Sequence, residues 1–273
     1  EILRCLVGSE MCIRDRCGAL PKEFDKNEWD VRVVIPNYSC IPDKFRSKFE
    51  YVAHFYMSAG SYITNKYVGI LKYVMDGITY YFIDNQEYFN CAVPYGDVRY
   101  DIEKFCFFDK AVLSMLKQID FCPDIIHCHD WQTGLIPVYL KNEFQADSFY
   151  WGMKSIMTIH NLKFQGVWDI KTMQGLTGFS ASLFTPDKLE AYKDGNFLKG
   201  GIVFADAVTT VSNTYADEIK TPFYGEGLDG LLRARSNSLR GIVNGIDYND
   251  FNPETDINLS ARYNATTFRK EKV

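Results

Sequence analysis

The sequence predicts an α/β protein with a Rossmann-like, doubly wound and mostly parallel sheet. From residue 101 onward, short β-branched apolar runs alternate with segments of helical hydrophobic spacing, which is typical of βαβ units. Polar clusters directly follow three of the predicted strands, where such sheets bind ligands. The chain has 273 residues, 47% of them hydrophobic, which is enough to bury one large core or two modest ones.

The first part of the chain is rich in predicted strands. The β-branched run Asp30 to Pro36 indicates a buried strand, and Tyr51 to Tyr56 indicates another. The segment Tyr67 to Asp84 has two aromatic and β-branched runs that are separated by Met75-Asp76-Gly77. Because Asp-Gly favours a tight turn, we expect a β-hairpin there.

Helices and strands then alternate to the end of the chain. Apolar residues between Ile102 and Ile119 fall near helical spacing. The elements expected after this helix are a strand at 124–127, a helix at 134–141, a strand at 155–159, a helix at 196–204, a strand at 207–211, a helix at 214–220 and a strand at 239–243.

Composition excludes several classes of partner. Thirty Lys and Arg against 35 Asp and Glu give a formal net charge of -5, so we expect no nucleic-acid partner. Eight cysteines without a CxxC pair favour reduced thiols. No apolar stretch approaches the roughly 20 residues that cross a bilayer, and the start has no signal-peptide pattern. We therefore expect a cytoplasmic protein without a membrane partner. The aromatic content of 15% fits core filling, with sugar stacking as the weaker alternative.

The polar clusters at the predicted strand ends define a candidate ligand site. They are His127-Cys128-His129-Asp130-Trp131, His160-Asn161 and Asn244-Gly245-Ile246-Asp247. Because carboxyl ends of parallel strands meet at one edge of a sheet, we expect these loops to form one site.

The first cluster has several interpretations. His127, His129 and Asp130 are possible metal ligands, but no other cluster completes a coordination sphere, so we expect no metal. We expect His127 to be a satisfied core residue. For Asp130 two interpretations carry equal weight: a cap of a helix that begins at Trp131, or a carboxylate that holds a sugar hydroxyl.

The other two clusters favour ligand contact. His160 stands at a strand end beside Asn161, whose amide both donates and accepts hydrogen bonds. Asn244-Gly245 is a hairpin signal, but the polar segment after it offers no partner strand, so a loop approached by ligand fits better.

Two glycine-containing segments complete the candidates. Gly225 to Gly230 lacks a preceding strand and has neither GK[ST] nor GxGxxG spacing, which disfavours a dinucleotide site and favours a loop leading into a helix at GLLRAR. Lys199-Gly200-Gly201 lies in a helical stretch, which indicates close packing or a backbone near ligand.

Taken together, these segments resemble the bacterial glycogen and starch synthases that use ADP-glucose, which have the GT-B glycosyltransferase fold. The resemblance runs from about Cys17 to the end and is carried most clearly by the segments HDW, IHN, NFLKGG, TTVS and NGID. It implies transfer of glucose from ADP-glucose to the non-reducing end of an α-1,4-glucan with retention of configuration. Both sugars are substrates, and no cofactor is implied.

The resemblance also assigns residues. The family's aspartate in HDW and histidine in IHN fall on Asp130 and His160, which we expect to be catalytic. The expected substrate-binding residues are Asn161, Asn244, Trp131 and Tyr95, the last from the segment Pro94-Tyr95-Gly96.

The chain departs from the family at both ends. Residues 1–16 lack the family's K-x-G-G-L loop, and we interpret them as an atypical, foreign segment. Residues 17–255 form the expected N-terminal GT-B domain, and 256–273 begin the crossing to a C-terminal domain that the chain lacks. Because that domain holds most of the donor, we expect the chain alone to be inactive.

Alternative functions remain open on the sequence. Another GT-B glycosyltransferase that uses a UDP-sugar is an alternative, because the C-terminal half reads most of the nucleotide base and only the motif set argues against it. A non-catalytic glucan-binding module fits the aromatic content. A metal-dependent hydrolase at His127, His129 and Asp130 is the most distant of the alternatives.

Overall fold

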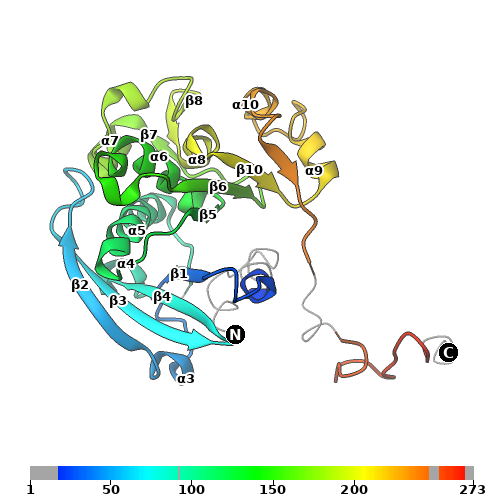
Figure 1. Ribbon diagram of the computed structural model, residues 1–273. Coiled ribbons are helices and arrows are strands. Elements are labelled where there is room, and N and C mark those ends of the chain that lie inside the picture. Colours follow the sequence, from blue (N-terminus) through cyan, green and yellow to red (C-terminus); the bar gives the residue numbers. More distant parts are fainter. Residues whose placement is uncertain (1–17, 92, 246–251, 268–273) are drawn as a thin grey trace.

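The computed structural model describes residues 18–91, 93–245 and 252–267 (Figure 1). The strands are β1 (Arg32–Pro36), β2 (Glu50–Met57), β3 (Lys66–Met75), β4 (Ile78–Asp84), β5 (Ile125–His129), β6 (Lys154–Ile159), β7 (Val167–Asp169), β8 (Glu190–Ala191), β9 (Asp194–Asn196), β10 (Ala207–Thr210) and β11 (Leu239–Gly241). The α-helices are α3 (Asp43–Arg46), α4 (Gln86–Phe89), α5 (Val98–Gln118), α6 (Leu135–Asn142), α7 (Ile170–Thr177), α8 (Phe197–Phe204), α9 (Asn213–Glu218) and α10 (Asp229–Ala234). Short 3-10 helices are η1 (Leu20–Glu23), η2 (Trp131–Thr133), η3 (Phe144–Ala146), η4 (Ser148–Tyr150) and η5 (Ala181–Leu183).

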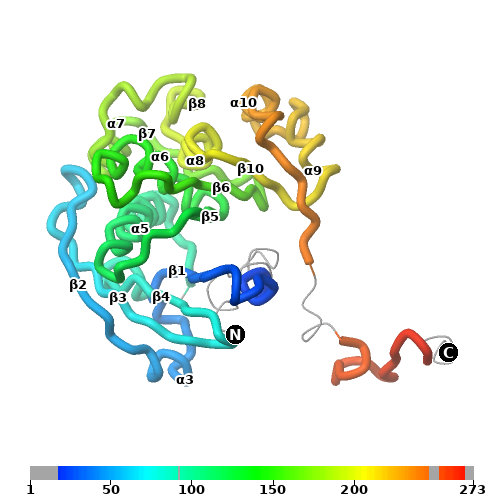
Figure 2. The backbone as a smooth tube through the Cα atoms, in the orientation of Figure 1, coloured from blue at the N-terminus to red at the C-terminus, as the bar shows by residue number. Residues whose placement is uncertain are grey.

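One sheet is wholly parallel and has the strand order β11-β10-β6-β5. Its strands β5, β6 and β10 run side by side through the molecule (Figure 2). Helices α6 and α8 lie in the connections between these strands, as the alternating pattern predicted. The α/β class is therefore confirmed, and the carboxyl ends of β5, β6, β10 and β11 share one edge.

The second four-stranded sheet is mixed, with the order β1-β4-β3-β2. Strand β1 is parallel to β4, whereas β2 and β3 are antiparallel to their neighbours. The predicted hairpin is present, and its turn residues Asp76 and Gly77 have φ angles of 54° and 73°, as a tight hairpin turn requires. Because a two-residue turn joins only antiparallel strands, the early strands form this separate mixed sheet rather than extending a single parallel one.

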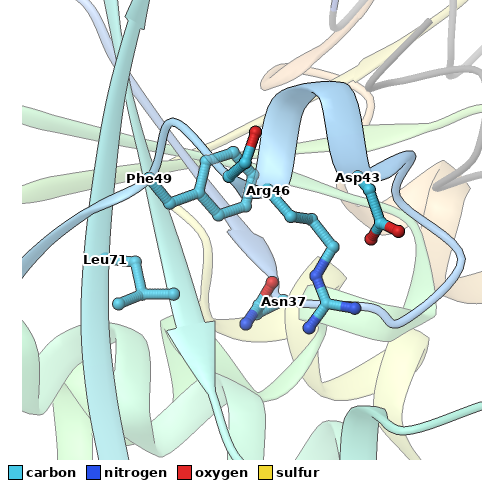
Figure 3. Close-up of a pocket in the computed structure, with 6 residues that line it drawn as sticks. Asn37, Asp43, Arg46, Phe49 and Leu71 are labelled. Atoms are coloured by element: carbon cyan, nitrogen blue, oxygen red, sulfur yellow. The ribbon is translucent and has the colours of Figure 1, made fainter.

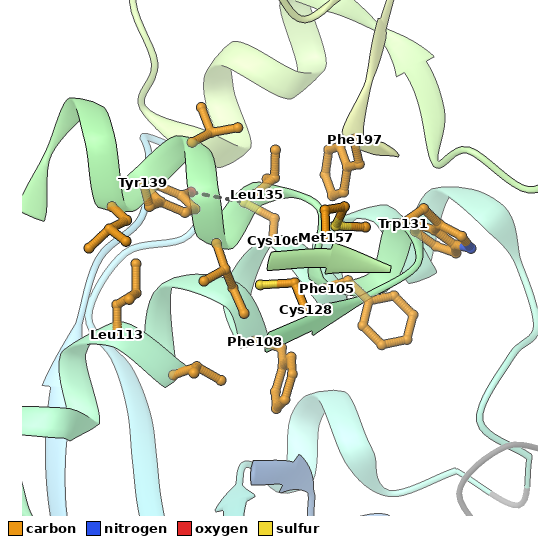
Figure 4. Close-up of a cluster of buried hydrophobic side chains, with 14 of the residues drawn as sticks. Phe105, Cys106, Phe108, Leu113, Cys128, Trp131, Leu135, Tyr139, Met157 and Phe197 are labelled. Atoms are coloured by element: carbon orange, nitrogen blue, oxygen red, sulfur yellow. Dashed lines mark hydrogen bonds between the residues drawn. The ribbon is translucent and has the colours of Figure 1, made fainter. Parts of the chain in front are cut away.

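Aromatic and aliphatic side chains fill the core between helices and sheets (Figure 4). Helix α5 contacts β4 of the mixed sheet as well as α6 and η2 beside the parallel one, so it joins the two sheets. Phe105 packs edge-on against Trp131, with ring centroids 5.1 Å apart. Tyr139 and Cys106 share a hydrogen bond of 3.4 Å in the same cluster (Figure 4). Burial raises the pKa of Cys106 to about 12, so its thiol stays protonated at neutral pH.

The chain between β6 and α8 forms short elements that the sequence patterns did not predict. Strands β7, β9 and β8 form a small antiparallel sheet, and α7 follows β7 directly. These strands are only two or three residues long, too short to show a hydrophobic period.

Two observations concern the cysteines and the helices of the described part. Its cysteines are free thiols, at Cys40, Cys91, Cys106, Cys122 and Cys128. No helix within the described ranges is both long and apolar enough to cross a membrane.

Close backbone packing joins α6 to α8, as the glycine pair of the α8 segment indicated. A Cβ on Gly201 would lie 3.2 Å from the Gly134 Cα, and one on Gly200 would lie 3.0 Å from Val138. At Gly134 the approach is closer, since a Cβ there would lie 2.4 Å from the Phe197 carbonyl oxygen.

We expect Gly134→Ala to lower the free energy of unfolding by about 1–3 kcal/mol, because the added methyl group must displace the backbone of α8. Gly230→Ala is the matched control: its Cβ would approach only the Arg233 side chain, at 3.7 Å, so its stability should stay equal or rise by up to about 1 kcal/mol. Urea unfolding of both variants measures the difference. Equal stabilities would contradict the packing argument.

Candidate functional site

The site is built around a bend in the backbone at Asp130, immediately after β5. Asp130 has φ 55° and ψ -170°, a conformation that costs a non-glycine residue of order 1–3 kcal/mol. The backbone is held there because the Asp130 amide donates to the Thr158 carbonyl oxygen of β6 at 2.9 Å. Such strain persists only where surrounding contacts fix it, and it is frequent at functional sites.

The Asp130 carboxylate connects β5 with the loop that follows β6. Its Oδ1 accepts the backbone N–H of His160 at 2.7 Å and that of Asn161 at 3.3 Å. The side chain is only 3% exposed, so these bonds form in a poorly solvated environment. The three residues that sequence reasoning placed in two separate loops are thus brought together.

One of the two interpretations of Asp130 is corrected by this geometry. The carboxylate makes no capping hydrogen bond to η2, the helix that begins at Trp131. An N-cap residue typically has an extended backbone, and the positive φ of Asp130 departs from that conformation.

The two imidazoles nearest Asp130 are in direct contact. His129 Nδ1 and His160 Nε2 are 3.1 Å apart, and the rings are tilted by 38°. A hydrogen bond between two ring nitrogens needs one donor and one acceptor, so at least one of these imidazoles is neutral while the bond exists. His160 is 9% exposed, which places its ring at the edge of the core.

His127 occupies a different position from the one expected. Its side chain is exposed rather than buried in the core. It is nevertheless satisfied, because its Nε2 lies 2.6 Å from Thr158 Oγ1, which in turn bonds to Thr209 Oγ1 at 2.6 Å. The alternation along β5 turns His127 away from the buried side chain of Cys128.

A buried ion pair fixes the loop that carries Tyr95. Asp101 and Lys104 on α5 form a salt bridge of 2.5 Å with almost fully buried side chains. Asp101 also accepts the Gly96 N–H at 3.0 Å, and Lys104 donates to the Pro94 carbonyl oxygen at 2.5 Å. The pair was not foreseen; its only sequence signal is the i,i+3 spacing of opposite charges on a helix.

Trp131 belongs to the core. It is 8% exposed and lies between Phe105 and Phe197, at centroid distances of 5.1 and 6.3 Å. Phe105 also contacts Tyr95, at 6.2 Å, so an aromatic row leads from the Tyr95 loop to the Asp130 bend. Contact of Tyr95 or Trp131 with a substrate stays a prediction.

Tyr215 is a further residue beside the site that sequence reasoning missed. Its hydroxyl accepts the Leu162 N–H at 3.3 Å, one residue beyond Asn161. Burial is the main cause that raises the pKa of Tyr215, and the Asp130 charge raises it further. The Asn161 side chain closes its own loop by accepting the Lys163 N–H at 3.1 Å.

Asn244 lies three residues beyond β11, on the same edge of the parallel sheet as Asp130 and His160. Its part in ligand binding stays a prediction, and Ile246 and Asp247 lie outside the described residues. Among the residues that the structure describes, no group of three or more His, Cys, Asp or Glu side chains is arranged to hold a metal ion.

The sequence is similar to proteins of a known family. The family described as the starch synthase catalytic domain matches residues 14–234. A glycogen synthase of Lachnospira eligens is 60% identical, covering 95% of this chain and 54% of the relative. One of Lachnoclostridium phytofermentans is 59% identical, covering 96% and 54%. The chain therefore spans about half the length of the curated relatives it matches.

A solved structure agrees with the fold. The catalytic domain of starch synthase IV from Arabidopsis thaliana, bound to ADP and acarbose, is similar with a TM-score of 0.82 and 29% sequence identity. The match covers 95% of this chain and 53% of that chain.

We expect Asp130→Ala to release the loop after β6. Hydrogen bonds to a charged group contribute about 1.5–3 kcal/mol, so amide exchange at His160 and Asn161 should accelerate by about 10- to 100-fold. Asp130→Asn retains an acceptor oxygen and should give a smaller increase. Hydrogen exchange resolved by NMR measures this, with Ile156 in the middle of β6 as the internal control. Unchanged exchange at His160 would contradict the role of the carboxylate.

Proposed function

The chain belongs to the family of starch synthase catalytic domains, and on this premise we propose that it is the acceptor-side half of a glycogen synthase. The parent enzyme transfers glucose from ADP-glucose to the non-reducing end of an α-1,4-glucan with retention. A C-terminal half of the enzyme holds most of the donor. The ADP in the starch synthase IV structure supports an adenine nucleotide over a UDP-sugar.

The observation that carries this proposal is the bond between the Asp130 carboxylate and the backbone of His160 and Asn161. It fixes the residues that carry an imidazole and an amide at the carboxyl end of β6, beside the end of β5, where ligands of α/β sheets bind. Imidazole, amide and carboxylate groups match the hydroxyls of a sugar, since together they both donate and accept hydrogen bonds.

Each group has a distinct task in the proposed transfer. The bond from the anomeric carbon to the diphosphate oxygen breaks, the acceptor 4-hydroxyl oxygen bonds to that carbon, and the hydroxyl proton leaves with the diphosphate. His160 hydrogen-bonds the reacting glucose. Asp130 acts as a positioning residue, because its Oδ1 already holds the loop that carries His160. Asn161, Asn244 and Tyr95 bind sugar hydroxyls.

The contact between His129 and His160 constrains the protonation of the pair. One of the two ring nitrogens must accept the hydrogen bond, so at least one ring is neutral while the bond exists. The leaving diphosphate needs positive charge to stabilise it, and we assign that charge to the C-terminal half of the parent enzyme.

The proposal is tested in a chimera, because the chain covers about half of its relatives. Residues 18–245 replace the corresponding residues of the Lachnospira eligens glycogen synthase, and glucose incorporation from ADP-glucose into glycogen is measured. We expect the chimera to be active and His160→Ala to reduce kcat/KM by at least about 100-fold, because a group that stabilises the transition state is lost.

His127→Ala in the same chimera is the matched control. It removes an imidazole of the neighbouring strand that hydrogen-bonds to Thr158, so kcat/KM should change by less than about fivefold, within the range of a surface hydrogen bond. Near-normal transfer by the His160 variant would overturn the assignment. An active chimera that prefers a UDP-sugar would overturn the donor and leave the fold assignment intact.

A further inference from the structure

Two tight turns, far apart in the sequence, both have strained backbone. The turn between β8 and β9 has positive φ at Tyr192 and Lys193, of 54° and 73°. The turn between α9 and α10 has positive φ at Glu226 and Gly227, of 45° and 78°. Three of these four residues are not glycine, so their left-handed conformation is costly. Such strain persists only where contacts hold it, and it is concentrated at functional sites.

Contacts between the two turns hold the second one in place. The Tyr192 hydroxyl donates to the Gly227 carbonyl oxygen at 3.2 Å. A Cβ on Gly227 would lie 2.7 Å from the same hydroxyl, so the Tyr192 side chain packs against bare backbone. On the other side of Glu226, the Gly225 N–H donates to the Thr221 carbonyl oxygen at 2.8 Å. The backbone is therefore fixed on both sides of Glu226.

Gln165 connects the second turn to the loop that carries His160. Its side-chain N–H groups donate to the Glu226 carbonyl oxygen at 3.0 Å and to the Leu162 carbonyl oxygen at 3.1 Å. Its side-chain oxygen accepts the Asn196 side-chain N–H at 2.6 Å, which fixes the orientation of the amide. One side chain thus joins the strained residue Glu226 to a residue two positions after His160.

The Glu226 carboxylate acts on the same tyrosine as Asp130. Burial is the main cause that raises the pKa of Tyr215, and the charges of Asp130, Glu226 and Glu218 raise it further. The Tyr215 hydroxyl accepts the Leu162 N–H at 3.3 Å, within the loop after β6. The carboxylates of Asp130 and Glu226 therefore both lie near one hydroxyl of the candidate site.

The surroundings of Glu226 are open and aromatic. Glu226 is itself an exposed residue. Tyr192, which packs against the turn, is 80% exposed. Phe223 and Tyr224 directly precede the turn, are exposed as well, and contact each other edge-on with ring centroids 4.7 Å apart. The strained turn therefore presents a carboxylate to solvent next to exposed aromatic rings.

We propose that Glu226 binds hydroxyl groups of the acceptor glucan and thereby sets the affinity of the transfer site for the acceptor. This assignment rests on the proposed function. A carboxylate accepts hydrogen bonds from two hydroxyls, and exposed rings beside it can pack on the C–H face of a pyranose. The diphosphate of ADP-glucose is an anion that Glu226 and Asp130 repel, whereas the acceptor is neutral, so the acceptor is the substrate that fits.

The backbone strain allows binding to be separated from stability. Glycine adopts a φ of 45° without steric cost, so Glu226→Gly removes the strain together with the carboxylate. We expect the urea midpoint of the 273-residue chain to stay equal or rise in this variant. A lower midpoint would show that Glu226 serves the fold, and it would overturn the proposal.

The kinetic test uses the chimera with maltoheptaose as the acceptor. We expect Glu226→Gln to raise KM for maltoheptaose about three- to tenfold, because an amide oxygen forms weaker hydrogen bonds than a carboxylate. Glu226→Gly should raise this KM by at least about tenfold, since both hydrogen bonds are lost. In Glu226→Gln, kcat and the KM for ADP-glucose should stay within twofold.

Glu218→Gln is the matched control. It removes the other glutamate whose charge raises the pKa of Tyr215, but Glu218 lies on α9 rather than on the strained turn. KM for maltoheptaose should stay within twofold in this variant. An equal rise in both glutamine variants would show that the charge around Tyr215, and not a contact at Glu226, sets the affinity, and it would overturn the proposal.

The substitutions leave a separate cavity intact. This cavity, of about 460 Å³, lies beside the mixed sheet, and its lining includes Asn37, Arg46 and Leu71 (Figure 3). All of its lining residues fall between positions 37 and 71, so none belongs to the two turns. A change in KM at Glu226 therefore cannot come from a change in the lining of this cavity.

The remaining outcomes distinguish this proposal from the proposed function. An active chimera in which both Glu226 variants keep the KM for maltoheptaose would overturn the role of Glu226 and leave the transfer function standing. A rise confined to the KM for ADP-glucose would overturn it as well, because the donor would then be the ligand. A chimera that transfers no glucose would overturn the proposed function, and this assignment with it.

Discussion

The organisation of the candidate site depends on the hydrogen bonds between the Asp130 carboxylate and the backbone of His160 and Asn161. These bonds join the loops after β5 and β6, in addition to the strand pairing and the contact between His129 and His160. The left-handed backbone at Asp130 costs of order 1–3 kcal/mol, and charge-assisted bonds in a buried position contribute a similar amount. The bend therefore persists because the loop after β6 stabilises it, and the loop is ordered because the bend presents a carboxylate to it.

Contacts made by helix α5 also hold the surroundings of the Asp130 bend in place. The buried pair of Asp101 and Lys104 holds the Tyr95 loop, and Phe105 on the same helix packs against Trp131 at the bend. Helix α5 also contacts the mixed sheet, so it links the candidate site to that sheet. Removing one partner of such a buried ion pair typically costs about 3–5 kcal/mol, because the other charge is left unpaired in the core.

Local patterns in the sequence determined most elements of this protein. The Asp-Gly turn specified the β3–β4 hairpin, and the alternation of apolar runs located β5, β6, β10 and the helices between them. The polar residues at strand ends, Asp130 and His160 among them, followed from the same patterns. The tertiary structure decided what depends on residues far apart in the chain: the bond from Asp130 to a loop 30 residues away, the burial of Trp131, the exposure of His127 and the division into two sheets. Periodicity reports which face of an element is apolar, but only packing decides which other element covers that face.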